Sequence, residues 1–596
     1  MTGFWDFVQQ GHNFIALRQA NHVKLGVRLR ERRFQRTSWQ STVQALIDGP
    51  ASRRIEPISF RTPLALLLIS LIAIAGVWWW LATPITLVRA PIDPAAKLLC
   101  VSYAPFRGAQ TPLDPSTYVP AAQIEQDLTQ LAKISDCVRT YSIENGLDQV
   151  PAMAGKVGLK VMQGIWLGSD RAKNFAQIST AIRLTKENPD VITSLVVGNE
   201  VLLRGEMTTP DLAAIIRAVK AQVTVPVTYA DVWEFWLRSH EIYNVVDFIT
   251  IHILPYWEDV PIRAKFAATH VNSIRQRMAV AFPGKEILIG ETGWPSEGRM
   301  REGALPSRTN QARVVSEILL MAKQQNFRVN LIEAYDQPWK RQLEGTVGGY
   351  WGLFNSVQRA LKYPPGEPVS NFPFWKWQMG AGLGFSIIVF VSAWATTRRR
   401  PWTPLLSPWI AVGLIATSAG ILLGVAADKM FYESYGIGGW VQWGALLLAG
   451  LVASVLGANA IVSGRSLPTF LDMFGPRGDE VSRLTLSMWC LGASLVVTTL
   501  IAAETALGFV FDPRYRDFPY ASLTMAAVPF ACLMLNRSQQ GRRQIAEAVF
   551  AGLLAGSAIY IAVNEGRDNW QSLWSCACYL LLAFTLWRAR GAQSLK

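Results

Sequence analysis

The chain of 596 residues is predicted to be an α/β protein. A (β/α)8 TIM barrel is expected between one N-terminal transmembrane helix and a C-terminal bundle of about seven transmembrane helices. Two observations predict this fold. Apolar, strand-like runs alternate with helical patterns over roughly 250 residues, the length that a (β/α)8 barrel needs. Apolar runs long enough to cross a bilayer precede this region and fill most of the chain after it.

The charge pattern is that of a membrane protein. The formal net charge is +14, and half of the residues are hydrophobic. Lys and Arg lie mainly between and beside the apolar runs, which is the positive-inside pattern, so no nucleic-acid partner is expected. The six cysteines show no metal-ligand spacing, and neither a metal nor a cofactor is expected.

Residues 1–62 form a basic segment without a catalytic motif, and residues 63–82 form the first transmembrane helix. A signal peptide is not expected, because the apolar run begins only at Pro63 and no small-residue cleavage site follows it. The triplet Trp78–Trp80 suits the far membrane interface. Because the basic side precedes the helix, the N-terminus is expected in the cytoplasm and the residues after Thr83 outside it.

Residues 97–355 carry the barrel pattern. Eight strand-like runs are expected at Leu98–Tyr103, Val138–Tyr141, Leu159–Trp166, Ile192–Val197, Val225–Tyr229, Val246–Ile251, Glu286–Ile289 and Arg328–Ala334. Helical patterns separate most of them, as at Ala121–Ile134, Phe175–Glu187, Asp211–Val223 and Gln311–Gln325. A doubly wound open sheet is the alternative, but no GxGxxG or P-loop follows any strand. Residues 356–376 are expected to be a Pro-rich linker.

Cys100 and Cys137 each precede a Val at the start of a predicted strand. They can pair if this region is extracytoplasmic, since disulfides persist in oxidising compartments. The interpretation that the sequence favours is two buried free thiols.

The polytopic membrane domain is predicted over residues 377–588, and the C-terminus, 589–596, is expected in the cytoplasm. Its helices are expected near 377–397, 404–426, 441–463, 485–510, 519–536, 546–563 and 571–588. The Arg-rich connections would face the cytoplasm, which gives eight spans with both termini inside and the barrel outside. Glu504 is the clearest ionisable residue within these spans. It marks either a functional site or a helix end that faces water or a neighbouring hydroxyl.

Two of the predicted strands end in a glutamate. Ile287–Ile289 stops at Gly290 and presents Glu291, and the run from Ser194 ends in Gly198, Asn199 and Glu200. A single glutamate of this kind is as readily a solvated residue at the end of a strand as a catalytic group, but two of them can meet across a barrel mouth. Retaining glycoside chemistry needs two carboxyl groups about 5–5.5 Å apart, one as the acid and one as the nucleophile. Asn199 offers an amide for a sugar 2-hydroxyl.

Aromatic residues follow the predicted strands where a sugar would lie. They are Tyr103, Tyr141, Trp166, Trp233, Trp236, Tyr256, Trp257, Trp294 and Trp339. Sugars present apolar C–H faces to rings, so such a set suits a polysaccharide. For any single ring, core or loop packing is the alternative.

The motifs GNE at Gly198–Glu200 and GETGWPSEG at Gly290–Gly298 resemble the two signatures of glycoside hydrolase family 17. Further matches in the family's order are YAPF at 103–106, RTYS at 139–142, GIWL at 164–167, HILPYW at 252–257 and EAYDQPWK at 333–340. The resemblance implies a (β/α)8 barrel with Glu200 as acid/base and Glu291 as nucleophile. It implies a substrate-binding set of Asn199, Tyr103, Arg139, Tyr141, Trp166, Tyr256, Trp294, Glu333 and Trp339. Gln337 departs from the family, which often has Glu there.

The wider arrangement resembles bacterial membrane-bound members of the family linked to cyclic β-1,3/1,6-glucan synthesis in rhizobia. It implies a retaining β-1,3-glucan glucanosyltransferase at the periplasmic face of the inner membrane. The expected partners are a β-1,3-glucan donor, a sugar acceptor, inner-membrane lipid and a membrane glucan synthase. Three alternatives stay open: an endo- or exo-hydrolase of β-1,3-glucan, a glucan-export or synthase-partner membrane protein, and a catalytically inactive glucan sensor.

Overall fold

The computed structural model describes residues 61–87, 97–363, 367–398, 406–475, 484–536 and 542–591. The predicted basic segment up to residue 60 lies outside these residues. So do Arg399, Arg400, Arg477, Arg483 and Arg537 of the predicted cytoplasmic loops, and the last five residues of the chain.

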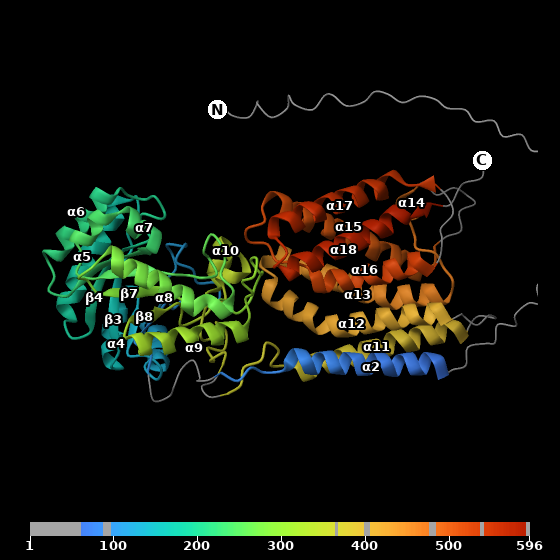
Figure 1. Ribbon diagram of the computed structural model, residues 1–596, viewed down its shortest axis with the longest axis horizontal. Helices are drawn as coiled ribbons and strands as arrows, with labels where there is room; N and C mark the ends of the chain where they lie inside the picture. Colours follow the sequence, from blue (N-terminus) through green and yellow to red (C-terminus); the bar gives the residue numbers. More distant parts are fainter. Residues whose placement is uncertain are drawn as a thin grey trace, which may run out of the picture. The chain divides into compact units, whose positions relative to one another are not determined.

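Eight parallel strands form a closed barrel in which each strand pairs with the next and β8 returns to β1 (Figure 1). The strands are β1 (Cys100–Ser102), β2 (Cys137–Arg139), β3 (Lys160–Ile165), β4 (Ile192–Asn199), β5 (Val227–Val232), β6 (Ile249–His252), β7 (Ile287–Thr292) and β8 (Arg328–Leu331). Val101 lies in register with both Val138 and Leu331, which closes the ring. The predicted barrel is confirmed, and all eight runs are strands.

The helices that connect the strands surround the barrel (Figure 1). They are α3 (Ala121–Leu131), α4 (Val150–Lys156), α5 (Arg171–Glu187), α6 (Thr209–Lys220), α7 (Trp233–Arg238), α8 (Ala264–Ala281), α9 (Arg308–Gln325) and α10 (Arg341–Gly348). Short 3-10 turns are η1 (Leu147–Gln149), η2 (His240–Asn244) and η3 (Pro338–Lys340). Several helices begin earlier than their apolar periodicity predicts because a polar side chain caps them. Asp170, for example, accepts hydrogen bonds from the backbone N–H groups of Ala172 and Lys173 at the start of α5.

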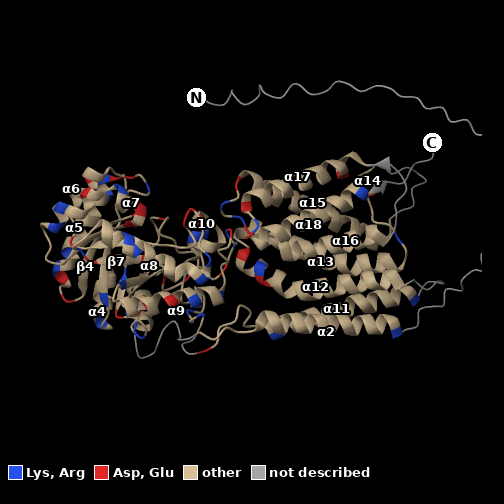
Figure 2. Cartoon of the chain, in the orientation of Figure 1, with Lys and Arg blue, Asp and Glu red and all other residues tan. Residues whose placement is uncertain are grey.

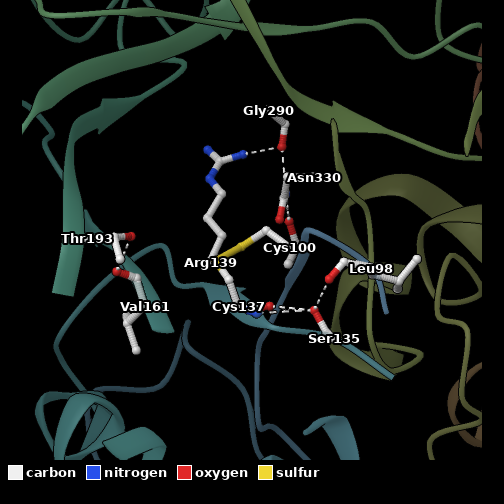
Figure 3. Close-up of a disulfide and its surroundings, with 10 residues drawn as sticks. Leu98, Cys100, Ser135, Cys137, Arg139, Val161, Thr193, Gly290 and Asn330 are labelled. Atoms are coloured by element: carbon white, nitrogen blue, oxygen red, sulfur yellow. Dashed lines mark hydrogen bonds between the residues drawn. A yellow bond between two sulfur atoms is a disulfide. The ribbon is translucent and has the colours of Figure 1, made fainter. Parts of the chain in front are cut away.

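Cys100 and Cys137 form a disulfide between the adjacent strands β1 and β2 (Figure 3). The expectation of two free thiols is therefore wrong. The two cysteines belong to a buried apolar cluster that includes Met162, Phe248 and Leu288. Neighbouring parallel strands in register bring the two Cα atoms to 4.4 Å, and this proximity cannot be seen in the spacing of 37 residues along the chain.

The remaining helices form an apolar bundle that includes the N-terminal helix. They are α2 (Arg61–Ala82), α11 (Trp375–Arg398), α12 (Leu406–Glu433), α13 (Gly436–Val462), α14 (Phe470–Phe474), α15 (Leu486–Phe511), α16 (Tyr520–Asn536), α17 (Ile545–Glu565) and α18 (Trp570–Arg588). The two-residue strands β9 (Arg542–Arg543) and β10 (Arg590–Gly591) pair antiparallel. Charged residues stand mainly near the ends of the long helices (Figure 2).

Six described helices are long and apolar enough to cross a membrane: α2, α11, α12, α13, α15 and α17. Helix α16 is apolar but has only 17 residues. Every helix predicted from the apolar runs is present in the bundle, whereas the count of eight spans and their orientation stay predictions.

Small residues allow the bundle helices to pack closely. Gly382 on α11 faces Gly420 on α12 so tightly that a Cβ at Gly382 would collide with the carbonyl oxygen of Gly420. Gly424 faces Trp78 of α2 in the same way, with an ideal Cβ 2.6 Å from the ring. Such small-residue contacts are a common way for membrane helices to associate. They join α2 to α11 and α12 despite the barrel that separates them in the sequence.

Loops at one end of the barrel contact helix ends of the bundle. Met300, in the loop after β7, accepts a hydrogen bond from Asn569 and donates one to Gln571. Arg341 at the start of α10 donates a hydrogen bond to the carbonyl oxygen of Ser434 at 2.9 Å. The left-handed Gly345 of α10 lies so close to Tyr515, in the loop after α15, that no side chain fits there.

Candidate active site

The two predicted catalytic glutamates lie at the carboxyl ends of β4 and β7, and each follows a glycine that the packing requires. Gly198 has a φ of +91°, and a Cβ on it would lie 2.8 Å from the side chain of Val201. Gly290 faces the side chain of Thr250 with no room for a Cβ. Glu200 itself has a φ of +52°, a conformation that non-glycine residues rarely adopt and that often accompanies function. The chain therefore turns sharply to present this carboxylate.

Arg139 and His252 connect the two carboxylates. His252 on β6 is fully buried, and its Nδ1 lies 2.8 Å from Oε1 of Glu200. Its Nε2 lies 3.5 Å from Oε1 of Glu291. Arg139 on β2 donates through Nη1 to Oε1 of Glu291 at 3.2 Å and to the carbonyl oxygen of Gly290 at 2.7 Å. Figure 3 shows Arg139 reaching from β2 toward Gly290.

The oxygen and nitrogen atoms of Glu200, His252 and Glu291 that could act as ligands all lie within 4.8 Å of one another. This is close enough to hold a metal ion. The guanidinium of Arg139, however, lies within hydrogen-bond distance of both His252 and Glu291. A divalent cation there would stand beside a fixed positive charge. The donor set therefore fits a hydrogen-bonded network of acid, base and cation better than it fits a metal centre.

The surroundings shift the acidity of several carboxyl groups. Burial raises the pKa of Glu200, but the hydrogen bond and charge of His252, helped by Arg139 and Arg204, outweigh burial and lower it overall. Burial raises the pKa of Glu333 to about 7, although Lys340 opposes the shift. The site thus contains one carboxyl group with a lowered pKa and another whose pKa is raised to about 7.

Five of the predicted substrate-binding residues have side chains in or beside this network. Asn199 accepts a hydrogen bond from Nη2 of Arg139, and the ring of Tyr141 lies 4.8 Å from the guanidinium carbon of Arg139. Trp166, 40% exposed, packs against the guanidinium of Arg204 at 4.2 Å. Glu333 bonds Nζ of Lys340 through both oxygens, at 2.9 and 3.0 Å. Arg139 itself is the fifth.

The other four predicted residues are held by packing. Tyr103 is buried, and its hydroxyl donates to Asp127 on α3. Tyr256 is fully buried and donates to the carbonyl oxygen of Arg299, and Trp294 is fully buried beside it. Trp339 packs edge-on against Phe106 and donates to Gln337 at 2.8 Å. Tyr103, Tyr256 and Trp294 shape the loops that carry the site, and they expose no ring surface to a sugar.

Sequence reasoning did not single out His252 and Lys340, although both stand inside motifs that resemble the family. His252 is the last residue of β6, so the rule that barrel chemistry lies at the carboxyl ends of strands would have found it. Lys340 lies seven residues beyond Glu333 in a 3-10 turn, and no strand position marks it.

Residues 100–352 match the BtgE/BtgC glycoside hydrolase domain. A glucan 1,3-beta-glucosidase of Candida albicans is 26% identical over 273 residues, covering 42% of this chain and 88% of that protein. A glucan 1,3-beta-glucosidase of Arthroderma benhamiae is 26% identical over 40% of this chain and 82% of that protein.

Among solved structures, a glycoside hydrolase family 17 beta-1,3-glucanosyltransferase of Rhizomucor miehei is similar with 25% identity and a TM-score of 0.40. The similarity covers 45% of this chain and 96% of the other. The family match ends at residue 352, before the bundle helices α11–α18 begin. The matched residues 100–352 contain all eight strands of the barrel together with Glu200 and Glu291, so this part of the chain is similar to glycoside hydrolase domains.

Proposed function

We propose that this protein is a retaining β-1,3-glucan glucanosyltransferase. The observation that carries the proposal is the proximity of an oxygen of Glu200 to one of Glu291, within 4.8 Å. Retaining enzymes hold their two carboxyl groups about 5–5.5 Å apart, whereas inverting enzymes leave about 6.5–9.5 Å for a water molecule. The curated relatives named above, whose names specify glucan 1,3-beta-glucosidases, support the choice of substrate.

The two carboxylates divide the chemistry. An oxygen of Glu291 attacks the anomeric carbon and forms a glycosyl ester, while the bond to the leaving oxygen breaks. Glu200 gives its proton to that oxygen. In the second step Glu200 takes the proton of an acceptor hydroxyl, whose oxygen attacks the anomeric carbon and releases Glu291. Arg139 is a positioning residue here, because its Nη1 lies 3.2 Å from Oε1 of Glu291 and holds that carboxylate in place for attack.

The acceptor decides between transfer and hydrolysis, since both share the glycosyl-enzyme intermediate. Transfer to a sugar hydroxyl is the favoured outcome because the barrel is joined to far more apolar helix than an anchor requires. Hydrolysis is the alternative, and the names of the curated relatives favour it. Product lengths and linkages separate the two: longer, branched or cyclic products mean transfer, and shorter products alone mean hydrolysis.

The proposed place of action is the periplasmic face of a bacterial inner membrane, in the synthesis or remodelling of periplasmic or cyclic β-glucan. Both termini would lie in the cytoplasm. The Cys100–Cys137 disulfide supports an extracytoplasmic barrel, because disulfides are rare in reducing compartments. A membrane glucan synthase is the proposed source of the donor. A role in export without catalysis is the competing proposal, and it predicts that glucan export survives the loss of both carboxylates.

The test uses the full chain and reduced laminari-oligosaccharides. Glu291→Gln and Glu200→Gln are each expected to lower turnover by about 10³-fold or more, because each removes a group that bonds or protonates the reacting atoms. Glu234→Gln on α7, an acidic residue outside the network, is the matched control and is expected to keep wild-type turnover. Full activity in the Glu200→Gln/Glu291→Gln double variant would overturn the proposal.

A further inference from the structure

A cavity of about 270 Å³ lies where α10 of the barrel meets the ends of bundle helices α12, α13 and α15. Arg341 and Gln342 of α10 line it from one side. Gln442 and Trp443 of α13, with Tyr515 in the loop after α15, line it from the other. Its volume approaches that of small-ligand pockets and far exceeds the space that one water molecule occupies.

Helix α10 connects this cavity to the catalytic network. It begins directly after Lys340, which bonds Glu333. Burial raises the pKa of Glu344, in the first turn of α10, and the charges of Glu200 and Glu291 raise it further although Lys340 opposes them. Helix α10 thus follows directly on the Lys340–Glu333 contact and lines the cavity with Arg341, Gln342, Gly345 and Thr346.

A second connection runs through aromatic rings. Tyr515, which lines the cavity, packs edge-on against Trp257, with 6.2 Å between the ring centroids. Trp257 lies in the loop that follows β6 and His252. A loop of the membrane bundle therefore stands against the rim that carries the catalytic residues.

Four buried polar atoms around the cavity have no hydrogen-bond partner within the part of the chain that the structure describes. They are Nε of Arg341, Nε of Arg516, Oδ1 of Asp517 and Oε2 of Glu433. Glu433 is only 7% exposed. Buried polar groups nearly always find a partner in protein, water or ligand. The residues that line this cavity therefore place guanidinium donors and carboxyl acceptors side by side.

A neutral polyhydroxylated molecule is the occupant that this lining fits. Each hydroxyl both donates and accepts, so one sugar ring satisfies guanidinium and carboxylate together. A phosphate would face the charges of Glu433 and Asp517, and a cation would face Arg341 and Arg516. Trp443 and Tyr515 supply ring surfaces for the apolar faces of a sugar.

We propose that this cavity, built jointly by the barrel and the membrane bundle, is a remote subsite for sugar units of the glucan chain bound at the catalytic carboxylates. The inference rests on the proposed function for the identity of the sugar. It gives Glu504 a positioning role, since its carboxylate accepts hydrogen bonds from Gln442 at 2.7 Å and Arg516 at 3.0 Å. The chain is thereby held at the barrel mouth and at the membrane bundle.

The experiment measures binding, so that it does not depend on turnover. The full-length Glu291→Gln protein in lipid nanodiscs is titrated with reduced laminaribiose and with reduced laminariheptaose by calorimetry, with and without Trp443→Ala. Trp443→Ala is expected to weaken heptaose binding about tenfold, as loss of an aromatic anchor commonly does, and biose binding less than twofold. Trp440→Ala, on the same helix but outside the cavity, is the control and is expected to leave both affinities unchanged. Trp443→Phe is expected to restore most of the heptaose affinity, which separates loss of a ring from loss of folding.

Three results would overturn the subsite. Equal weakening for biose and heptaose would mean that Trp443 supports the fold of the whole site. If Trp443→Ala leaves heptaose binding unchanged but removes a co-purifying phospholipid seen by native mass spectrometry, the cavity binds a lipid headgroup. Unchanged heptaose binding alone would mean that the glucan does not reach the cavity. Failure of the proposed function would appear separately, as wild-type turnover in the Glu291→Gln protein.

Discussion

His252 controls the protonation of the proposed acid catalyst. Its hydrogen bond and positive charge lower the pKa of Glu200 against the raising effect of burial. A general acid must be protonated before it reacts, so a lowered pKa moves the alkaline limb of the kcat/KM profile to lower pH.

Replacing His252 is therefore expected to shift the pH profile of the enzyme. In His252→Gln the positive charge is gone and burial remains, so the pKa of Glu200 rises and the alkaline limb moves to higher pH. Initial rates on a laminari-oligosaccharide from pH 4 to 9 measure the shift. The control is His270→Gln on α8, because His270 pairs with Glu258 outside the network. A limb that stays in place, or moves to lower pH, would contradict the role assigned to His252.

The residue scale is also where the sequence predicts least. Glu200, Glu291, Arg139 and Asn199 could be named because strand ends and motifs mark them. The burial of Tyr103, Tyr256 and Trp294 could not, because whether a ring lies against a sugar or against a neighbouring loop depends on contacts distant in sequence.

At the scale of elements, the disulfide fastens β1 to β2 within the barrel interior. The two cysteines are 37 residues apart in sequence, so the crosslink closes a loop and lowers the entropy of the unfolded chain. Loop-closure arithmetic for this length gives a stabilisation of about 4 kcal/mol, at the upper end of the usual range.

Removing this disulfide is expected to destabilise the barrel. In detergent, the Cys100→Ser/Cys137→Ser variant should unfold at a lower temperature than the wild type. Chemical reduction of the disulfide should lower the unfolding temperature of the wild type toward that of the variant. Intrinsic fluorescence during heating measures both. Cys532→Ser removes a free thiol of the bundle and serves as the control. Equal unfolding temperatures for wild type and the double variant would show that the crosslink does not stabilise the fold.

The contact between α11 and α12 depends on a glycine pair. Gly382→Val is expected to push the helices apart and to lower stability by about 1–3 kcal/mol, the usual cost of overpacking. Gly384→Val, two residues along the same helix with no atom within 4 Å of an added Cβ, is the matched control. Thermal unfolding in detergent compares the stabilities of the two variants. Equal losses of stability would mean that valine itself is unfavourable in this helix, and that the contact between α11 and α12 does not cause the effect.

At the scale of the whole molecule, the orientation in the membrane is open to a direct test. In a background where the four free cysteines are serine, Val280→Cys on α8 is expected to react with a membrane-impermeant maleimide in spheroplasts. Ser466→Cys, between α13 and α14, is expected to react only after lysis, because the Lys and Arg bias places that loop in the cytoplasm. The reverse pattern would invert the proposed topology.

The architecture is the level that the sequence predicts best. Long apolar runs and alternating strand and helix patterns are local signals, and each of them became an element of the expected type. The joint between barrel and bundle was not predicted. It depends on single contacts such as Met300 with Asn569, which carry no periodicity.

The close approach of Gly345 to Tyr515 constrains how this protein can be rebuilt. Because no side chain fits at residue 345, the barrel and its membrane partner are matched surfaces rather than interchangeable modules. A barrel grafted onto a different anchor would lose the neighbour that holds α10 in place, and with it the support for Lys340 beside Glu333. Chimeras that exchange α10 together with the loop after α15 are therefore expected to keep more activity than chimeras cut between them.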